Sequence, residues 1–176
     1  MARLMRGVDA GLGWVLAAMM AALVACVAWQ VLSRYVLASP STVTDELARL
    51  IFIWLAMLGS AYTLGQRRHL AISLLAQIVP PQRLRPLNVL LVLLIIAFAG
   101  GVMIYGGLRM TLATFSTGQV TPTLRLPAGY LYLSVPIAGA LIVLYSLAIL
   151  RDIFGPEARG PTDPLPDPVV EGEAAR

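Results

Sequence analysis

The sequence predicts an all-α membrane protein with four transmembrane helices, both termini in the cytoplasm, and a short interfacial helix between the second and third spans. Three observations support this fold class. Hydrophobic residues make up 59% of the 176 residues, and charged residues only 12%. The mean hydropathy is +0.81, so the chain is apolar on average. Four uncharged windows, each near the roughly 20 residues that cross a bilayer, cover residues 10–33, 50–66, 86–108 and 126–150.

The first span is expected over about residues 9–36. A signal peptide is an alternative interpretation, because Arg3 and Arg6 precede the apolar run. That run is too long for a signal peptide, and Arg34 falls where the apolar core of one should be uninterrupted, so we expect an uncleaved span. Small side chains recur along it at every fourth position, which lets another helix approach closely. They are Ala17, Ala21 and Ala25.

The second span is expected over about residues 44–65. Its uncharged window is short, so the helix reaches spanning length only if it begins near Asp45 and Glu46. Thr42 is the expected N-cap, and Asp45 three residues later gives a pattern close to a capping box. The acidic pair therefore belongs to the first turn of this helix, where negative charge suits the helix dipole.

Two residues further along the second span are expected to meet another helix. Trp54 falls near the middle of the span, away from either membrane interface, so we expect its ring to pack against a helix. Gly59 follows and offers a point of close approach.

An apolar run at residues 69–79 is too short to span the membrane and lies between pairs of basic residues. We expect a helix along the cytoplasmic interface, with basic side chains that reach the phosphates of membrane lipids. These interfacial anchor residues are Arg67, Arg68, His69, Arg83 and Arg85. A re-entrant or partly buried connector is the alternative interpretation.

The third span is expected over about residues 86–109 and the fourth over about residues 126–151. The connection between them, from Thr111 onward, is rich in Thr and Ser and carries little charge. We expect it to be the main loop outside the cytoplasm and a docking surface for a partner. Pro136 is expected to kink the fourth span, because proline removes one backbone hydrogen bond.

The distribution of arginine predicts the orientation. All 13 basic residues are arginine, and most of them lie at the two termini and in the connection between the second and third spans. The positive-inside rule places these regions in the cytoplasm. The predicted transmembrane domain covers residues 1–154, and residues 155–176, rich in Pro and acidic side chains, are expected to form a disordered cytoplasmic tail.

Few residues could carry chemistry. His69 is the single histidine and Cys26 the single cysteine, which excludes a bis-histidine haem and an intramolecular disulfide. Ionisable residues are absent from the middle of every span, which argues against a substrate or ion site in this chain. Arginines do not cluster on a soluble domain, so nucleic acid is not an expected partner. We expect no catalytic, substrate-binding or metal site, and no cofactor.

Charges of both signs gather where the first two spans join. Antiparallel packing would bring Arg34 to Glu46, and a guanidinium pairs well with a carboxylate. Arg49 can contact Glu46 or Asp45 one turn away. We therefore expect a structural clasp that also forms a subunit interface, made of Arg34, Asp45, Glu46, Arg49, Trp54 and Gly59. In the alternative interpretation, Arg34 only reaches the headgroups while the acids are solvated in the loop.

Taken in order, several segments resemble a known family. They are Arg34-Tyr35-Val36, Asp45-Glu46-Leu47-Ala48-Arg49, Phe52 and Trp54, Leu58-Gly59-Ser60-Ala61, and His69 before the run that ends in Val79-Pro80. This set resembles the small, Q-type membrane subunit of tripartite ATP-independent periplasmic (TRAP) transporters, most densely over residues 34–80. The family commonly has an acidic residue after the histidine where this chain has Ser73, so no role of that carboxylate is carried over.

The resemblance implies a transporter subunit of the bacterial inner membrane and not an enzyme. In such transporters a soluble periplasmic binding protein delivers an organic acid, and a large M-type subunit holds the substrate and sodium sites. The small subunit is part of the fixed scaffold and helps to dock the binding protein. Two other interpretations are the small four-span subunit of a tripartite tricarboxylate transporter and a structural membrane protein without a transport role.

Overall fold

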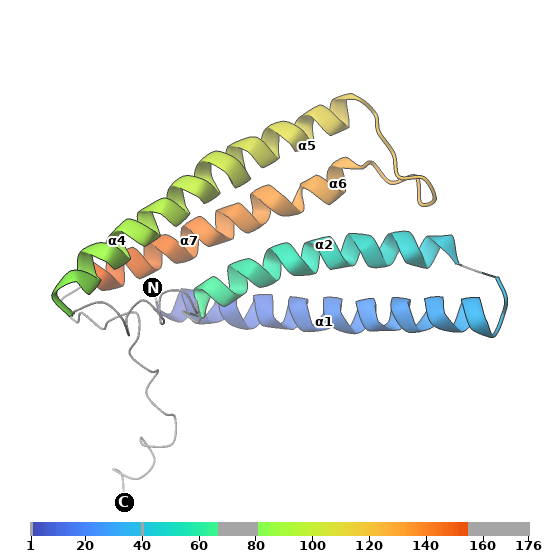
Figure 1. Ribbon diagram of the computed structural model, residues 1–176, viewed down its shortest axis with the longest axis horizontal. Coiled ribbons are helices and arrows are strands. Elements are labelled where there is room, and N and C mark those ends of the chain that lie inside the picture. The colour runs from blue at the N-terminus through green and yellow to red at the C-terminus, as the bar shows by residue number, and fades with distance from the viewer. Residues whose placement is uncertain (1, 40, 67–80, 155–176) are drawn as a thin grey trace, which may run out of the picture.

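The computed structural model describes residues 2–39, 41–66 and 81–154, and these residues are largely helical (Figure 1). The helices are α1 (Ala2–Tyr35), α2 (Thr42–Gly65), α4 (Pro81–Phe98), the π-helix η1 (Ala99–Gly106), α5 (Gly107–Ser116), α6 (Gly129–Tyr132) and α7 (Ser134–Phe154). Because α4, η1 and α5 follow one another without a break, they form one rod. Four segments are long and apolar enough to cross a membrane, which confirms the predicted all-α fold with four spans.

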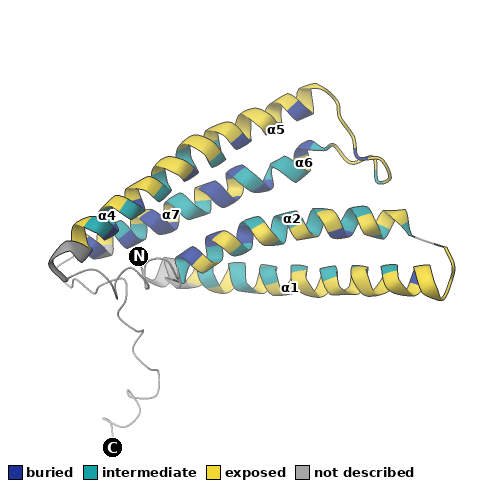
Figure 2. Cartoon of the chain, in the orientation of Figure 1, coloured by how far each residue is buried: buried dark blue, intermediate teal, exposed yellow. Residues whose placement is uncertain are grey.

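The four spans lie side by side in one layer. Helix α1 packs against α2, α2 against α7, and α7 against the rod formed by α4, η1 and α5. The order across the layer is therefore α1, α2, α7 and the rod (Figure 1). The two inner spans are more buried than the two at the edges: α7 is the most buried span, and α1, at one edge, is the least buried (Figure 2).

The layer has two ends, which we name by what they carry. The loop end carries the connections at residues 36–41 and 117–128, and the terminal end carries the start of α1 and the end of α7 (Figure 1). This up-and-down arrangement agrees with four antiparallel spans.

Helix α1 meets α2 through one narrow seam. The half-buried or buried residues along α1 recur every three or four positions, which is the spacing of one helix face. From Leu12 onward they include Leu12, Leu16, Met19, Leu23, Cys26, Gln30 and Ser33. The alanine stripe at Ala17, Ala21 and Ala25 lies on the exposed side, so it does not form the contact with α2.

The start of α2 differs from the prediction by one residue. Ser41 is the N-cap, and the backbone amide of Thr44 donates to its side-chain oxygen at 3.5 Å. Thr42 is already the first helical residue, so the predicted capping box between Thr42 and Asp45 is wrong. Asp45 still lies in the first turn, as expected.

The third span is longer than predicted and runs through Arg109 to Ser116. The Thr-rich stretch assigned to a loop is helical as far as Ser116, and its hydroxyls bond back to carbonyls of the preceding turn. Thr111 Oγ1 donates to the Gly107 carbonyl, and Thr114 Oγ1 to the Met110 carbonyl, both at 2.8 Å. Such bonds satisfy polar side chains within the helix, and the loop is reduced to residues 117–128.

The fourth span is interrupted near its start. Helix α6 ends at Tyr132 and α7 begins at Ser134, so Pro136 falls in the first turn of α7, where proline is tolerated. Beside this break, the rod approaches α7 closely. A Cβ on Gly107 would lie 3.0 Å from Pro136 Cδ, and one on Gly139 would lie 2.8 Å from Met103 Cβ.

Several predicted features lie outside the described residues. The interfacial helix at residues 69–79, with Arg67, Arg68 and His69, is among them, and so is the tail at residues 155–176. Arg83 belongs to α4, but its side chain is also outside the described part.

Candidate interaction site

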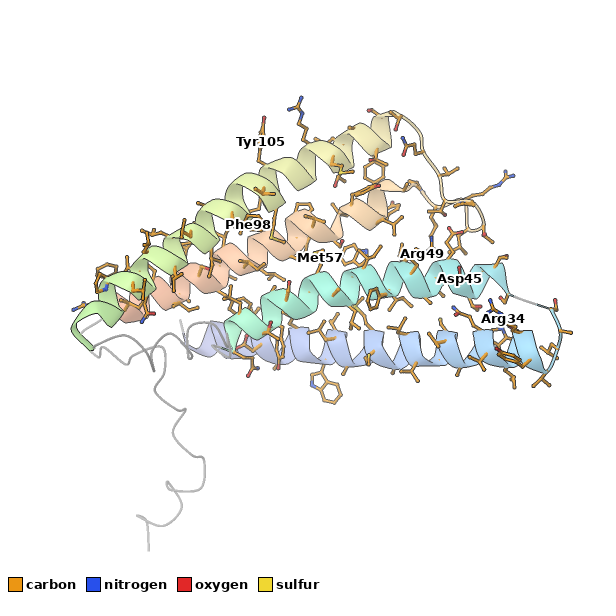
Figure 3. All side chains as sticks on the ribbon, in the orientation of Figure 1. Arg34, Asp45, Arg49, Met57, Phe98 and Tyr105 are labelled. Carbon is orange, nitrogen blue, oxygen red and sulfur yellow. The ribbon has the colours of Figure 1, made fainter. Side chains whose placement is uncertain are left out.

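The charged residues of the predicted clasp gather at the loop end (Figure 3). Arg34 comes from the last turn of α1, and Asp45 and Arg49 come from the first two turns of α2. The capped start of α2 after the short connection at residues 36–41 brings these elements together.

The predicted ion pair between Arg34 and Glu46 is not formed in the described chain. Glu46 Oε2 instead accepts a hydrogen bond from the Thr123 amide at 2.8 Å and one from the Leu124 amide at 3.3 Å. Arg34 is exposed, so water can solvate its guanidinium without a partner. The Glu46 carboxylate provides two acceptor oxygens, and the loop presents two consecutive amides to them.

The loop that Glu46 contacts is a closed turn between residues 117 and 128. The Thr121 amide donates to the Leu126 carbonyl at 2.8 Å, and the Ala128 amide to the Gln119 carbonyl at 2.8 Å. Within this turn Arg125 has a φ of 52°, in the left-handed region that side chains rarely adopt. Glu46 therefore connects the α1–α2 hairpin to a well-defined loop of the other hairpin.

Asp45 and Arg49 form the expected contact one turn apart. Arg49 Nη2 lies 3.6 Å from Asp45 Oδ2, and both side chains are mostly exposed. An exposed pair of this kind contributes little stability, typically below about 1 kcal/mol. In this pair the negative charge of Asp45 partly neutralises the positive charge of Arg49.

Trp54 contacts another helix, as expected from its position in the span. Its indole Nε1 donates to the Tyr130 carbonyl of α6 at 3.1 Å. The Tyr130 ring in turn packs edge-on against Phe115 of α5, with centroids 5.5 Å apart. Trp54 thus joins α2 to the interrupted start of the fourth span, next to the loop that Glu46 contacts.

Gly59 does not meet another helix within the described chain, since an added Cβ there would have no atom within 4 Å. The close approach along α2 occurs at Gly65, where a Cβ would lie 2.5 Å from the Tyr145 ring. The Tyr145 hydroxyl donates to Asp9 Oδ1 at 2.6 Å and so reaches α1 from α7. Sequence reasoning missed this contact, although the glycine at the end of α2 was a signal for it.

At the terminal end, Arg85 joins α4 to α7. Its guanidinium donates to the Ile153 carbonyl at 3.1 Å and lies over the Phe154 ring, 6.0 Å from the centroid. A cation at a helix C-terminus satisfies a free carbonyl and suits the helix dipole. Arg85 therefore has a packing role that the expectation of a lipid anchor did not include.

The polar contacts of the described residues are structural in kind. They join helices to each other and to the 117–128 loop. In the part of the chain that the structure describes, His, Cys, Asp and Glu side chains do not gather in groups that could hold a metal ion.

Comparison with known proteins identifies the family. The family of tripartite ATP-independent periplasmic transporters, DctQ component, matches residues 23–155 of the chain. The chain belongs to this family. This confirms the resemblance drawn from the sequence, and it favours the TRAP interpretation over a tricarboxylate transporter subunit. A DctQ component is part of a transporter and not an enzyme, and its tripartite family implies two further protein components.

Two relatives illustrate the match of this DctQ-family chain. It is 26% identical to the sialic acid TRAP transporter small permease protein SiaQ of Vibrio cholerae over 129 residues, which cover 73% of each chain. It is 35% identical to a putative TRAP transporter small permease protein of Haemophilus influenzae over 51 residues, 29% of this chain and 32% of that one. Together with the four apolar spans, these matches describe a multi-pass membrane subunit of a TRAP transporter.

Proposed function

We propose that this DctQ-family chain is the scaffold subunit of a TRAP transporter that takes up an organic acid with a cation gradient. It pairs with a large M-type subunit in the bacterial inner membrane and helps to dock the periplasmic binding protein. Its termini lie in the cytoplasm, and its loop end faces the periplasm. The one-layer arrangement of the spans carries this proposal, because a layer leaves two broad faces for a second membrane protein.

The interface with the large subunit is best supported at small residues that have no neighbour within this chain. An added Cβ at Gly59, Gly100 or Gly101 would have no atom within 4 Å. The exposed alanine stripe of α1 adds a further small surface. In lipid, small residues favour helix association because they let backbones approach closely. We therefore propose that Gly59 is an interface residue and that it contacts a helix of the large subunit.

Substrate and coupling ions are assigned to the large subunit. The spans of this chain have no ionisable residue near their middle, where transporters usually place such groups. The relative from Vibrio cholerae is named for sialic acid, which supports an organic acid as the substrate class.

The two ends of the layer receive different roles in this proposal. At the loop end, Arg34, Asp45 and Arg49 form an exposed charged rim around the contact between Glu46 and the 117–128 loop, where the binding protein docks. At the cytoplasmic end, the anchor residues contact lipid phosphates, and they are Arg67, Arg68, His69, Arg83 and Arg85.

Coexpression tests the proposal. A tagged form of this chain, produced together with the large TRAP subunit and extracted in mild detergent, should copurify with it in a fixed ratio. Recovery of this chain only as a stable homo-oligomer would overturn the subunit assignment. An unrelated four-span membrane protein with the same tag serves as the control for non-specific capture.

A further inference from the structure

Arg125 differs from the other arginines at the loop end in its location. Arg34, Arg49 and Arg109 belong to the spanning helices α1, α2 and α5, whereas Arg125 lies on the connecting loop between α5 and α6. Arg125 is exposed, and it forms no ion pair with a described acidic residue.

The loop fixes the position of Arg125. The backbone at Arg125 is left-handed, which costs about 1 kcal/mol or more for a residue with a side chain. Its amide donates to the Thr121 carbonyl at 3.2 Å, and the two preceding amides are bound by Glu46. These contacts hold the turn in one conformation. A group presented by a rigid turn loses less conformational entropy on binding than one on a mobile loop.

The charges around Arg125 leave it available for a partner. The carboxylate of Glu46 is occupied by the amides of Thr123 and Leu124, and that of Asp45 lies beside Arg49. The loop end therefore carries, on a fixed turn, a guanidinium that forms no ion pair with a described carboxylate. A guanidinium binds a carboxylate through two parallel hydrogen bonds, so the complementary surface is acidic.

We propose that Arg125 is a docking residue that binds a carboxylate on an acidic surface of the soluble substrate-binding protein. Glu46 acts as a positioning residue that holds the turn. The inference rests on the proposed function, because it requires this chain to be the small subunit of a TRAP transporter. It adds the contact residue and the chemistry of the surface that it binds.

The test uses the assembled complex of this chain with its large subunit, immobilised in lipid nanodiscs, and the purified binding protein as the probe. Arg125→Ala should weaken binding about tenfold, and Arg125→Glu should weaken it more, mainly through slower association at low salt. Glu46→Gln should weaken binding less than Arg125→Ala does, because the loop amides lose one carboxylate oxygen as an acceptor while the Arg125 side chain remains. Arg109→Ala is the matched control, since it removes the same charge from a spanning helix and should leave binding unchanged.

Two readouts separate this inference from the proposed function. Each variant is first checked for copurification with the large subunit, which depends on the proposed function alone. If Arg125→Ala copurifies normally and binds the probe with wild-type affinity, the docking role is wrong while the subunit assignment stands. An equal loss in Arg109→Ala would also overturn it, because binding would then follow net charge and not this residue. A failure of the wild-type chain to copurify would count against the proposed function itself.

Discussion

Glu46 lies in α2, and its carboxylate accepts hydrogen bonds from two consecutive amides of the 117–128 loop. These bonds cross between the two hairpins at the loop end. Hydrogen bonds to a charged acceptor are stronger than neutral ones, so a single side chain can hold this loop in place. The neighbouring Asp45 points to Arg49 instead and has no such role.

Replacing Glu46 with Ala should loosen the loop. The Thr123 and Leu124 amides would lose their acceptor, and we expect their hydrogen exchange to speed up by about fivefold or more. Exchange measured by mass spectrometry on the detergent-solubilised chain checks this. Asp45→Ala removes a carboxylate from the same turn and should leave exchange of the loop unchanged. Unchanged exchange in Glu46→Ala would show that the carboxylate does not hold the loop.

Exchanging the charges of Arg34 and Glu46 should not restore function. Their side chains do not pair, and an arginine at position 46 could not accept a hydrogen bond from the loop amides. The double substitution Arg34→Glu with Glu46→Arg should therefore match the single substitution Glu46→Arg in loop exchange and in assembly with the large subunit. Recovery in the double variant would show that the ion pair forms in the membrane.

At the scale of elements, the spans are joined by a few contacts that cross from one helix to another. The Trp54 indole joins α2 to α6, and the Tyr145 hydroxyl joins α7 to α1 past Gly65. Such contacts matter in lipid because apolar burial alone does not hold helices together there. Together with Arg85 they fix how the spans sit against one another.

Gly65→Ala should destabilise the chain. The added Cβ would overlap the Tyr145 ring and displace its hydroxyl from Asp9, and overpacking of this kind costs about 1–3 kcal/mol. Thermal unfolding in detergent measures the effect.

The matched control for Gly65→Ala is Gly59→Ala on the same helix. Its Cβ meets nothing within this chain, so stability should stay the same or rise by up to about 1 kcal/mol from the better helix propensity of alanine. Equal destabilisation in the two variants would contradict the contact at Gly65. Loss of copurification with the large subunit in Gly59→Ala alone would support the proposed interface.

Trp54→Phe should cost about 1 kcal/mol, because it keeps an aromatic ring but removes the donor for the Tyr130 carbonyl. Chemical unfolding in detergent, followed by circular dichroism, checks this. Trp14→Phe is the control, since Trp14 is 79% exposed and should not affect stability. If Trp54→Phe lowers the free energy of unfolding no more than Trp14→Phe does, the hydrogen bond from the Trp54 indole to Tyr130 contributes nothing to stability.

The sequence predicted the spans well and their contacts poorly, for physical reasons. Uncharged windows of membrane length identify spans, because a bilayer excludes charge strongly. The end of the third span was misplaced, since the hydroxyl of Thr111 bonds within the helix and so behaves there as a less polar group. The partner of Glu46 is 77 residues away in sequence, and nothing local to residues 34–49 could reveal it.

At the scale of the whole molecule, the single layer suits a subunit that packs against another membrane protein. Helix α1 packs mainly against α2, with one hydrogen bond from Tyr145 of α7 to Asp9, and the surface of the layer exposes many large apolar side chains. Lipid or another membrane protein can cover these side chains. The small residues on its surface and the rigid loop at one end suit a fixed subunit that contacts other proteins.

Uptake by proteoliposomes measures whether this chain is a required subunit of the transporter. The transported acid is identified from the ligand that copurifies with the binding protein, and its uptake is measured with each membrane subunit alone and with both. We expect uptake only when this chain, the large subunit and the binding protein are all present. Full uptake by the large subunit and binding protein without this chain would show that the chain is not required, and uptake by this chain without the large subunit would show that the substrate site is not in the large subunit.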